Sequence, residues 1–149
     1  MFHRLYQYNH STNEKLIRYL NENSVDHKQV SSWMSHLLNA HLTWLSRLRG
    51  EASPFAVWQE HERSQWLAIN QQAWETTQQF LDDTDDLTQT IVYQNTKGTS
   101  FKNRVDDILW HVLNHSTHHR GQISTVIRQQ GLTPEPMDYI FYVRKEREI

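Results

Sequence analysis

Cysteine is absent from this sequence, and long hydrophobic runs are absent as well. Without cysteine the chain forms no disulfide and offers neither a thiolate ligand for zinc nor a cysteine nucleophile. Any metal ion that it binds must therefore be held by nitrogen and oxygen ligands. Because no apolar run approaches about 18 residues and no signal-peptide core follows Met1–Arg4, we expect a soluble, cytoplasmic protein with no membrane partner.

The chain also has no excess of charge of one sign. Its 15 Lys and Arg residues nearly balance 17 Asp and Glu residues, which gives a formal net charge of −2. Acidic and basic residues are mixed along the chain, so we expect no nucleic-acid partner, which would call for a basic surface. The densest acidic run, Asp82–Asp86, is interpreted as a solvated loop rather than a cation site.

The residues that are present are typical of a packed globule. Of the 149 residues 37% are hydrophobic, and six are Trp and six are Tyr. This length, with no repeat, linker or low-complexity tract, predicts a single domain over residues 1–149. The aromatic residues exceed the needs of one small core, which predicts exposed aromatic stripes and a homodimer.

Apolar residues recur with the period of a helix along most of the chain, which predicts an all-α fold, a four-helix bundle. The second helix is expected to begin at a cap on Ser31 or Ser32 and to stop at Gly50. Apolar and polar residues alternate over residues 90–101, and Asn95 and Gly98 interrupt the pattern. This segment predicts a short β-hairpin before the fourth helix. The other expected elements are helices over about residues 3–22, 58–81 and 104–130, and a short helix from residue 138.

Four of the ten histidines fall within the nine residues 111–119. Imidazoles four residues apart stand one turn apart on the same side of a helix, where two of them can bind one metal ion. A helical projection places His115 and His119 at the edge of the apolar stripe, and His111 and His118 on the outer surface. His115 and His119 are therefore candidate metal ligands, and the alternative is that all four are ordinary polar helix positions.

The third ligand is expected from the second helix, which offers His36 and His41. His41 lies near the centre of the apolar stripe of that helix, where a histidine is more often a hydrogen-bonded core residue. His36 lies on the flank, which matches the edge location of His115. Helix geometry by itself leaves both residues open as the third ligand.

Five motifs are spread over nearly the whole length of the chain. They are Tyr8-Asn9 with Asn13, the run from Ser35 to Leu48 that contains His36 and Trp44, Tyr93 with Gly98, the run from His115 to Gln122, and Gly131–Pro134 with Asp138–Ile140. Together they resemble the DinB-like superfamily, which is distinct from the DNA polymerase that shares the name. The sequence departs from the commonest pattern at His41, where relatives often carry an acidic residue.

The resemblance implies that a metal triad falls on His36, His115 and His119, with zinc or nickel as the ion. It leaves open whether His41 hydrogen-bonds to a ligand or competes as one. Three neutral imidazoles leave coordination positions for water or substrate, as in catalytic rather than structural sites. Gln122, Asn39, Asn114 and His118 are candidates to hydrogen-bond to the ligands, and Arg120 is a candidate to orient an anionic substrate group or to pair with an acid.

Two functions are compatible with the resemblance, because members of the superfamily include thiol-dependent transferases and isomerases, and commonly form homodimers. The first is a metal-dependent hydrolase or thiol-dependent S-transferase with a small-molecule thiol substrate. The alternative is a non-catalytic, metal-binding stress-response protein. An open metal position beside a pocket would favour the enzyme, whereas a site plugged by a side chain such as Tyr139 or Tyr142 would not.

Overall fold

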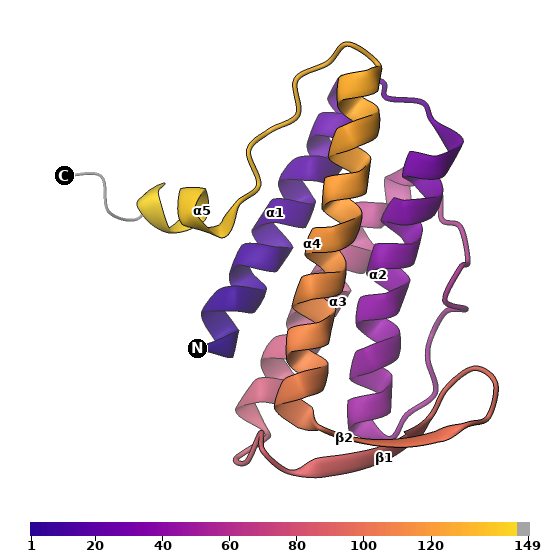
Figure 1. The fold of residues 1–149 in the computed structure, drawn as a ribbon, viewed down its shortest axis with the longest axis vertical. Coiled ribbons are helices and arrows are strands. Elements are labelled where there is room, and N and C mark those ends of the chain that lie inside the picture. Colours follow the sequence, from indigo (N-terminus) through magenta and orange to yellow (C-terminus); the bar gives the residue numbers. More distant parts are fainter. Residues whose placement is uncertain (146–149) are drawn as a thin grey trace.

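The structure, a computed structural model, describes residues 1–145 and is built mainly from four long helices (Figure 1). It confirms the predicted all-α bundle with a short hairpin before the fourth long helix and a short C-terminal helix. The elements are α1 (Phe2–Glu22), α2 (Lys28–Arg49), a 3-10 turn (Arg63–Gln65), α3 (Trp66–Asp82), β1 (Thr90–Gln94), β2 (Ser100–Arg104), α4 (Val105–Gln129) and α5 (Tyr139–Lys145).

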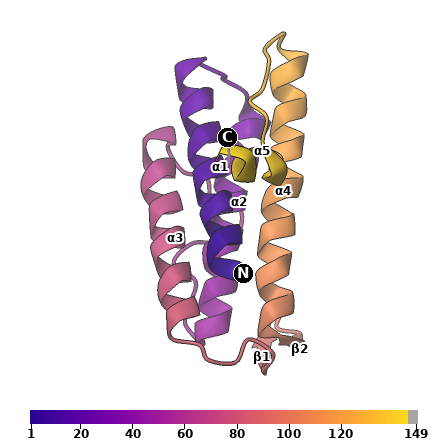
Figure 2. The same ribbon diagram turned by 90° about the vertical axis from the view of Figure 1, so that its left-hand side faces the viewer.

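Each long helix has two neighbours. Helix α1 packs against α3 and α4, and α2 packs against the same two helices, so α1 and α2 occupy opposite corners of the bundle. In Figures 1 and 2, α1 and α4 run upward whereas α2 and α3 run downward. The chain must therefore return along the length of the bundle between α2 and α3.

Residues 51–62 make this return as an irregular crossover that lies against α2 (Figure 1). Several hydrogen bonds join the two segments, among them Thr43 Oγ1 to Ser53 Oγ at 3.0 Å, Asn39 Nδ2 to the Gln59 carbonyl at 2.7 Å, and the His61 amide to Ser35 Oγ at 3.1 Å. The prediction of a helix from residue 58 was wrong for this reason, since residues 58–61 bond to α2 instead of to one another. Helix α3 begins only at Trp66.

The predicted start of the second helix was also wrong. Helix α2 begins at Lys28, three to four residues before the expected serine caps, and Val30 is buried inside it instead of preceding it. Its predicted end is confirmed, because Gly50 has the left-handed φ of 67° that closes a helix and disfavours a side chain. The hairpin pairs Thr90 with Arg104 and Gln94 with Ser100 in antiparallel register.

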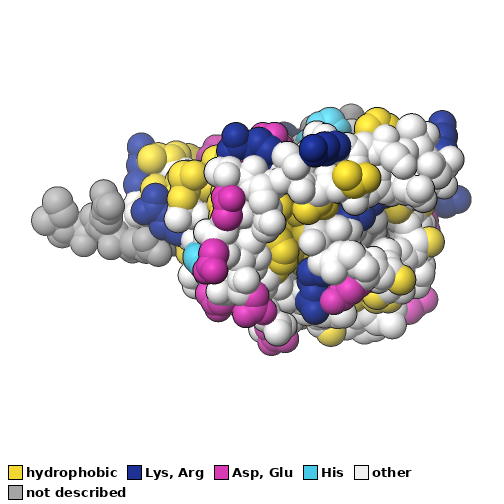
Figure 3. Space-filling view, turned by 90° about the horizontal axis from the view of Figure 1, so that it is seen from below, with side chains coloured by type: hydrophobic (Ala, Val, Ile, Leu, Met, Phe, Trp, Pro, Cys, Tyr) yellow, Lys and Arg dark blue, Asp and Glu magenta, His cyan; other side chains and the backbone are white. Residues whose placement is uncertain are grey.

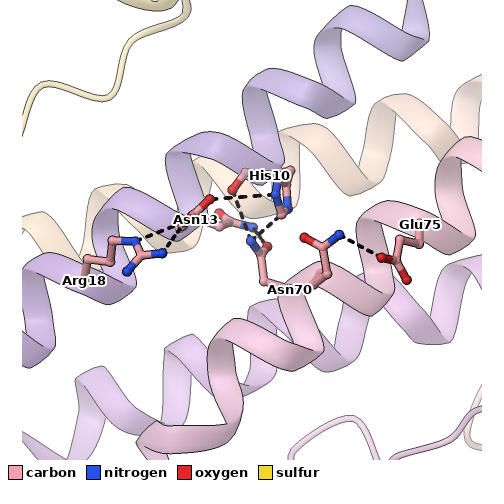
Figure 4. Close-up of polar contacts among 7 residues, drawn as sticks. His10, Asn13, Arg18, Asn70 and Glu75 are labelled. Carbon is pink, nitrogen blue, oxygen red and sulfur yellow. Dashed lines mark hydrogen bonds and ion pairs between the residues drawn. The ribbon is translucent and has the colours of Figure 1, made fainter.

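Two apolar clusters form the core, and a layer of buried polar residues lies between them along α1 and α4. One cluster contains Leu16, Ile17, Trp66, Ile123 and Ile127, and the other contains Phe2, Tyr6, Leu109, Val112 and Leu113. In the layer, Asn13 Nδ2 donates to Asn70 Oδ1 at 3.2 Å, and Asn70 Nδ2 donates to the His10 carbonyl at 3.1 Å (Figure 4). The buried histidines of the bundle lie at this level.

The surface carries both signs of charge. Seen from below, the bundle presents acidic and basic side chains among uncharged ones (Figure 3). The acidic run Asp82–Asp86 is exposed apart from Thr84, as the sequence predicted for a solvated loop. Among the residues that the structure describes, no helix has the length and apolar character needed to cross a membrane.

Candidate metal centre

Three histidine rings from two helices converge in the polar layer. His115 Nε2 lies 3.2 Å from His36 Nε2 and 3.1 Å from His119 Nε2, so one nitrogen from α2 meets two from α4. One nitrogen of each ring lies within 4.8 Å of the nitrogens of the other two. His36 and His119 are buried and His115 is half-buried. The three residues that the sequence and the resemblance singled out therefore meet at one point.

The other ring nitrogens of His36 and His119 fix where their protons lie. His36 Nδ1 donates to the Val57 carbonyl at 3.0 Å, because a carbonyl oxygen can only accept, and His119 Nδ1 donates to Gln122 Oε1 at 2.7 Å. In the neutral rings, Nε2 is then an unprotonated acceptor. The two acceptors face His115 Nε2, which carries at most one proton and cannot satisfy both. A cation at the centre satisfies all three.

The spacing fits such a cation. Nitrogens bound about 2.0–2.1 Å from a tetrahedral zinc ion stand roughly 3.3–3.4 Å apart. The observed separations of 3.1 and 3.2 Å are close to this value. Imidazole nitrogen suits both zinc and nickel, so the donor set fits a divalent transition metal without selecting one ion.

Burial and mutual repulsion keep these imidazoles neutral. Burial, followed by repulsion from His119 and His36, lowers the pKa of His115 to about 3. Burial also lowers the pKa of His36, against the opposing effect of its hydrogen bond to Val57, and burial and then His36 lower the pKa of His119. Since a metal ligand must be neutral imidazole, all three rings are ready to bind an ion at neutral pH.

Trp58, on the crossover, was not anticipated from the sequence. Its ring stacks on His36 with centroids 3.7 Å apart and an interplanar angle of 6°, although 59% of Trp58 is exposed. Asn39 does not hydrogen-bond to a ligand as suggested, but it anchors the crossover through Gln59 and His61, whose Nε2 lies 2.6 Å from Asn39 Oδ1. No local pattern marks Trp58, because the contact depends on the path of a segment expected to be helical.

His41 lies outside the cluster. Its Nε2 donates to Thr77 Oγ1 at 2.9 Å, since the Thr77 hydroxyl proton is already given to the Ala73 carbonyl at 2.7 Å. His41 Nδ1 is buried without a partner among the described residues, and burial lowers the pKa of the ring to about 3. This is the environment of a neutral core histidine.

The remaining candidates divide between the two faces of α4. Gln122 holds His119, whereas His118 is exposed with its ring centroid 5.1 Å from that of His119. Arg120 points away from the cluster toward α1, where its Nη1 donates to Asn9 Oδ1 at 2.6 Å and Asn13 Oδ1 at 2.8 Å. Among residues 1–145 it pairs with no acid, and it does not face the histidine cluster.

A small cavity lies near the cluster on the hairpin side. His111, whose ring centroid is 5.6 Å from that of His115, lines a cavity of about 240 Å³ together with Trp44 and Tyr93. Tyr139 and Tyr142 do not plug the histidine site, because both pack edge-on against Tyr8 of α1. Neither tyrosine therefore covers the histidine cluster.

Comparisons with known proteins agree with this architecture. The sequence model of the DinB family matches residues 1–148. The chain is also 26% identical to Protein DinB of Bacillus subtilis (strain 168), over 94% of this chain and 92% of that protein.

Proposed function

The chain belongs to the DinB family, and on this basis we propose that it is a metal-dependent enzyme, a hydrolase or thiol-dependent S-transferase. The ion is a divalent transition metal, zinc or nickel, held by His36, His115 and His119. The observation that carries the proposal is the approach of three imidazole Nε2 atoms at 3.1 and 3.2 Å, two of them unprotonated. Without an ion, this arrangement would leave buried acceptors facing one another.

The residues of the chain hold the site in one protonation state and one orientation. The Val57 carbonyl and Gln122 fix the tautomers of His36 and His119, and such partners orient metal ligands and raise their basicity. Trp58 covers one face of His36 and excludes water from it. A bound ion would lower the pKa of a thiol or water at an open position and so provide a nucleophile at neutral pH. A small thiol can approach through the cavity beside His111.

Metal content tests the ligand assignment. We expect about one zinc or nickel ion per chain by elemental analysis of protein purified without a metal-affinity step. His36→Ala, His115→Ala and His119→Ala should each remove most of it, whereas His3→Ala and His27→Ala should not. Stoichiometric metal in the triple variant would rule out this site.

Cobalt substitution separates the enzyme from the alternative, a non-catalytic metal-binding protein. Addition of 2-mercaptoethanol to the Co²⁺-loaded protein should produce a sulfur-to-cobalt charge-transfer band, because the thiolate takes an open position. The His115→Ala variant serves as the control and should not give this band. A protein that binds Co²⁺ in equal stoichiometry but never coordinates the thiol would contradict the S-transferase assignment.

We further propose that the chain forms a homodimer. Met1, Trp110 and Phe141 are 79%, 41% and 39% exposed, and large exposed apolar side chains are typical of interface cores. Sedimentation equilibrium should give twice the chain mass, and Trp110→Ser should shift the protein toward the monomer. A monomeric wild-type protein at tens of micromolar would contradict this proposal.

A further inference from the structure

Arg120 is a buried cation whose hydrogen-bond partners are all neutral. It is 2% exposed, and the ion pairs found within residues 1–145 do not include it. Nη1 donates to Asn9 and Asn13, and Nη2 donates to Thr117 Oγ1 at 3.1 Å and to the Tyr8 hydroxyl at 3.5 Å. Burial lowers the pKa of Arg120, with Tyr8 acting in the opposite direction. A buried charge without a counterion is costly, so a negative partner would be stabilised here.

A cavity of about 720 Å³ adjoins this guanidinium on the face of α4 turned away from the histidine cluster. It lies between α1, α4 and the segment Pro134–Tyr139. The polar lining includes Arg120, Tyr8 and Thr117 together with Asn114, Ser124 and Arg128, and the apolar lining includes Leu5, Leu113 and Met137. Cavities of this size, mostly apolar with a few polar groups, are typical of small-molecule sites.

The segment after α4 closes the cavity and is tied to α1 at three points. The Tyr8 hydroxyl donates to the Met137 carbonyl at 2.5 Å, the Tyr19 hydroxyl donates to the Thr133 carbonyl at 2.8 Å, and Lys15 pairs with Glu135 at 3.2 Å. Figure 1 shows this segment descending beside α1. Tyr139 is one of the residues that line the cavity, and its buried hydroxyl has no hydrogen-bond partner among the described residues. The wall of the cavity therefore includes a residue with an unused donor.

Gly121 contributes the space beside Arg120. A Cβ atom added at this helical position would meet nothing within 4 Å, so no neighbour requires glycine there. Glycine inside a helix destabilises the protein relative to alanine. Because Gly121 lines the cavity, its missing side chain enlarges the space next to the buried cation.

We propose that this cavity binds a small organic monoanion, a carboxylate on an apolar body, whose carboxylate pairs with Arg120. The apolar lining takes the body of the ligand, and Arg120 supplies the positive charge for the carboxylate. The Tyr8 and Thr117 hydroxyls donate to the Met137 and Leu113 carbonyls, so they are not donors to the ligand. Glu135 and Asp138 also line the cavity, but both are exposed and Glu135 is paired with Lys15. The site is separate from the histidine cluster, since Arg120 bonds to α1 whereas His115 and His119 face α2.

Titration with hexanoate and with its neutral analogue hexanamide, followed by amide NMR shifts, tests the site. Wild-type protein and His115→Ala should bind hexanoate equally, because the site does not depend on a metal ligand. Hexanamide should bind at least about ten times more weakly, because a charge-assisted hydrogen bond is lost. Gly121→Leu should weaken hexanoate binding at least about tenfold by filling the cavity. Thr125→Leu, one turn further along the helix and outside the cavity lining, should leave binding unchanged.

Several results would overturn the proposal. They are equal affinity for hexanoate and hexanamide, loss of hexanoate binding in His115→Ala, unchanged affinity in Gly121→Leu, and no saturable binding of hexanoate to the wild-type protein. Gly121→Leu keeps Arg120 and its partners, so the test does not depend on a variant that removes a buried cation. Arg120→Lys, where it folds, should bind hexanoate more weakly because the planar guanidinium and its hydrogen bonds are lost.

Discussion

Trp58 and His36 lie face to face, with ring centroids 3.7 Å apart and an interplanar angle of 6°. The stack joins the crossover to α2 at the residue whose Nδ1 also bonds to the Val57 carbonyl. Two consecutive residues of the crossover thus set the orientation of one ligand, Val57 through the ring edge and Trp58 through the ring face. The path of residues 51–62 is therefore part of the candidate metal centre as well as a connection.

We predict that Trp58 reports on metal binding. Paramagnetic Ni²⁺ bound at His36 would lie within a few ångströms of the Trp58 ring, so Ni²⁺ should quench tryptophan emission. Trp58→Phe should remove most of this change, whereas Trp110→Phe, at an exposed position of α4, should retain it. Equal quenching in wild-type protein and Trp58→Phe would place the ion elsewhere.

Gln122 should tune the affinity of the site without being a ligand. Gln122→Ala removes the acceptor of the His119 Nδ1 proton, so we expect metal affinity to fall about 10- to 100-fold. Competition with a zinc-binding dye measures this change. Gln122→Glu, which keeps an acceptor, should retain most of the affinity, and Gln129→Ala, at an exposed position of α4, should have no effect. Wild-type affinity in Gln122→Ala would show that the bond contributes nothing.

The helices of the bundle follow from patterns within each segment, whereas the crossover does not. Apolar periodicity located α1 and α4 to within about two residues, because each helix buries one face along its whole length. The same periodicity misassigned residues 58–65. Trp58 stacks on His36 of α2, and backbone groups of Gln59 and His61 bond to Asn39 and Ser35 of the same helix. Contacts between distant segments leave no periodic signal.

The histidine cluster was predictable in part for the same reason. The i, i+4 spacing and helical projection were sufficient to single out His115 and His119. Helix geometry could not decide between His36 and His41. It gives the direction of a side chain around the helix axis, but not the residues that the side chain contacts. His36 meets the crossover and α4, whereas His41 meets Thr77 of α3. The partners of Arg120 were not accessible either, because Asn9 and Asn13 lie more than 100 residues away in the sequence.

His41 should make the protein less stable in acid. Its pKa is about 3 in the folded state and about 6.5 in the unfolded chain, so between these values the unfolded state binds more protons. The free energy of unfolding therefore falls as the pH falls through this window, by about 2 kcal/mol between pH 7.5 and 5 from this residue. Urea denaturation of metal-free protein across this range measures the loss.

His41→Met serves as the comparison, because it keeps a buried side chain but removes the titrating group. We expect its stability to depend less steeply on pH than that of the wild-type protein, whereas His3→Met, at an exposed position, should follow the wild type.

Because His41 is not in the cluster, His41→Asn should keep stoichiometric metal. Loss of the metal in His41→Asn, with retention in His36→Ala, would reverse the choice of third ligand.

Metal should be retained well below pH 6.5. Protons displace a metal ion from imidazole only when they can bind the free ring, and burial and mutual repulsion lower the pKa of all three histidines, that of His115 to about 3. Equilibrium dialysis against zinc over a pH series should give half-release below pH 6.5, the ordinary pKa of histidine.

His118→Gln provides a matched variant for this release, because His118 lowers the pKa of both His115 and His119 by repulsion. Removing it should raise those two pKa values and shift metal release slightly to higher pH.

Circular dichroism at neutral pH after chelation should still show a helical protein with a lower melting temperature, because the apolar clusters do not depend on the ion. Collapse to a coil on chelation would make the ion structural and would contradict an open, functional site.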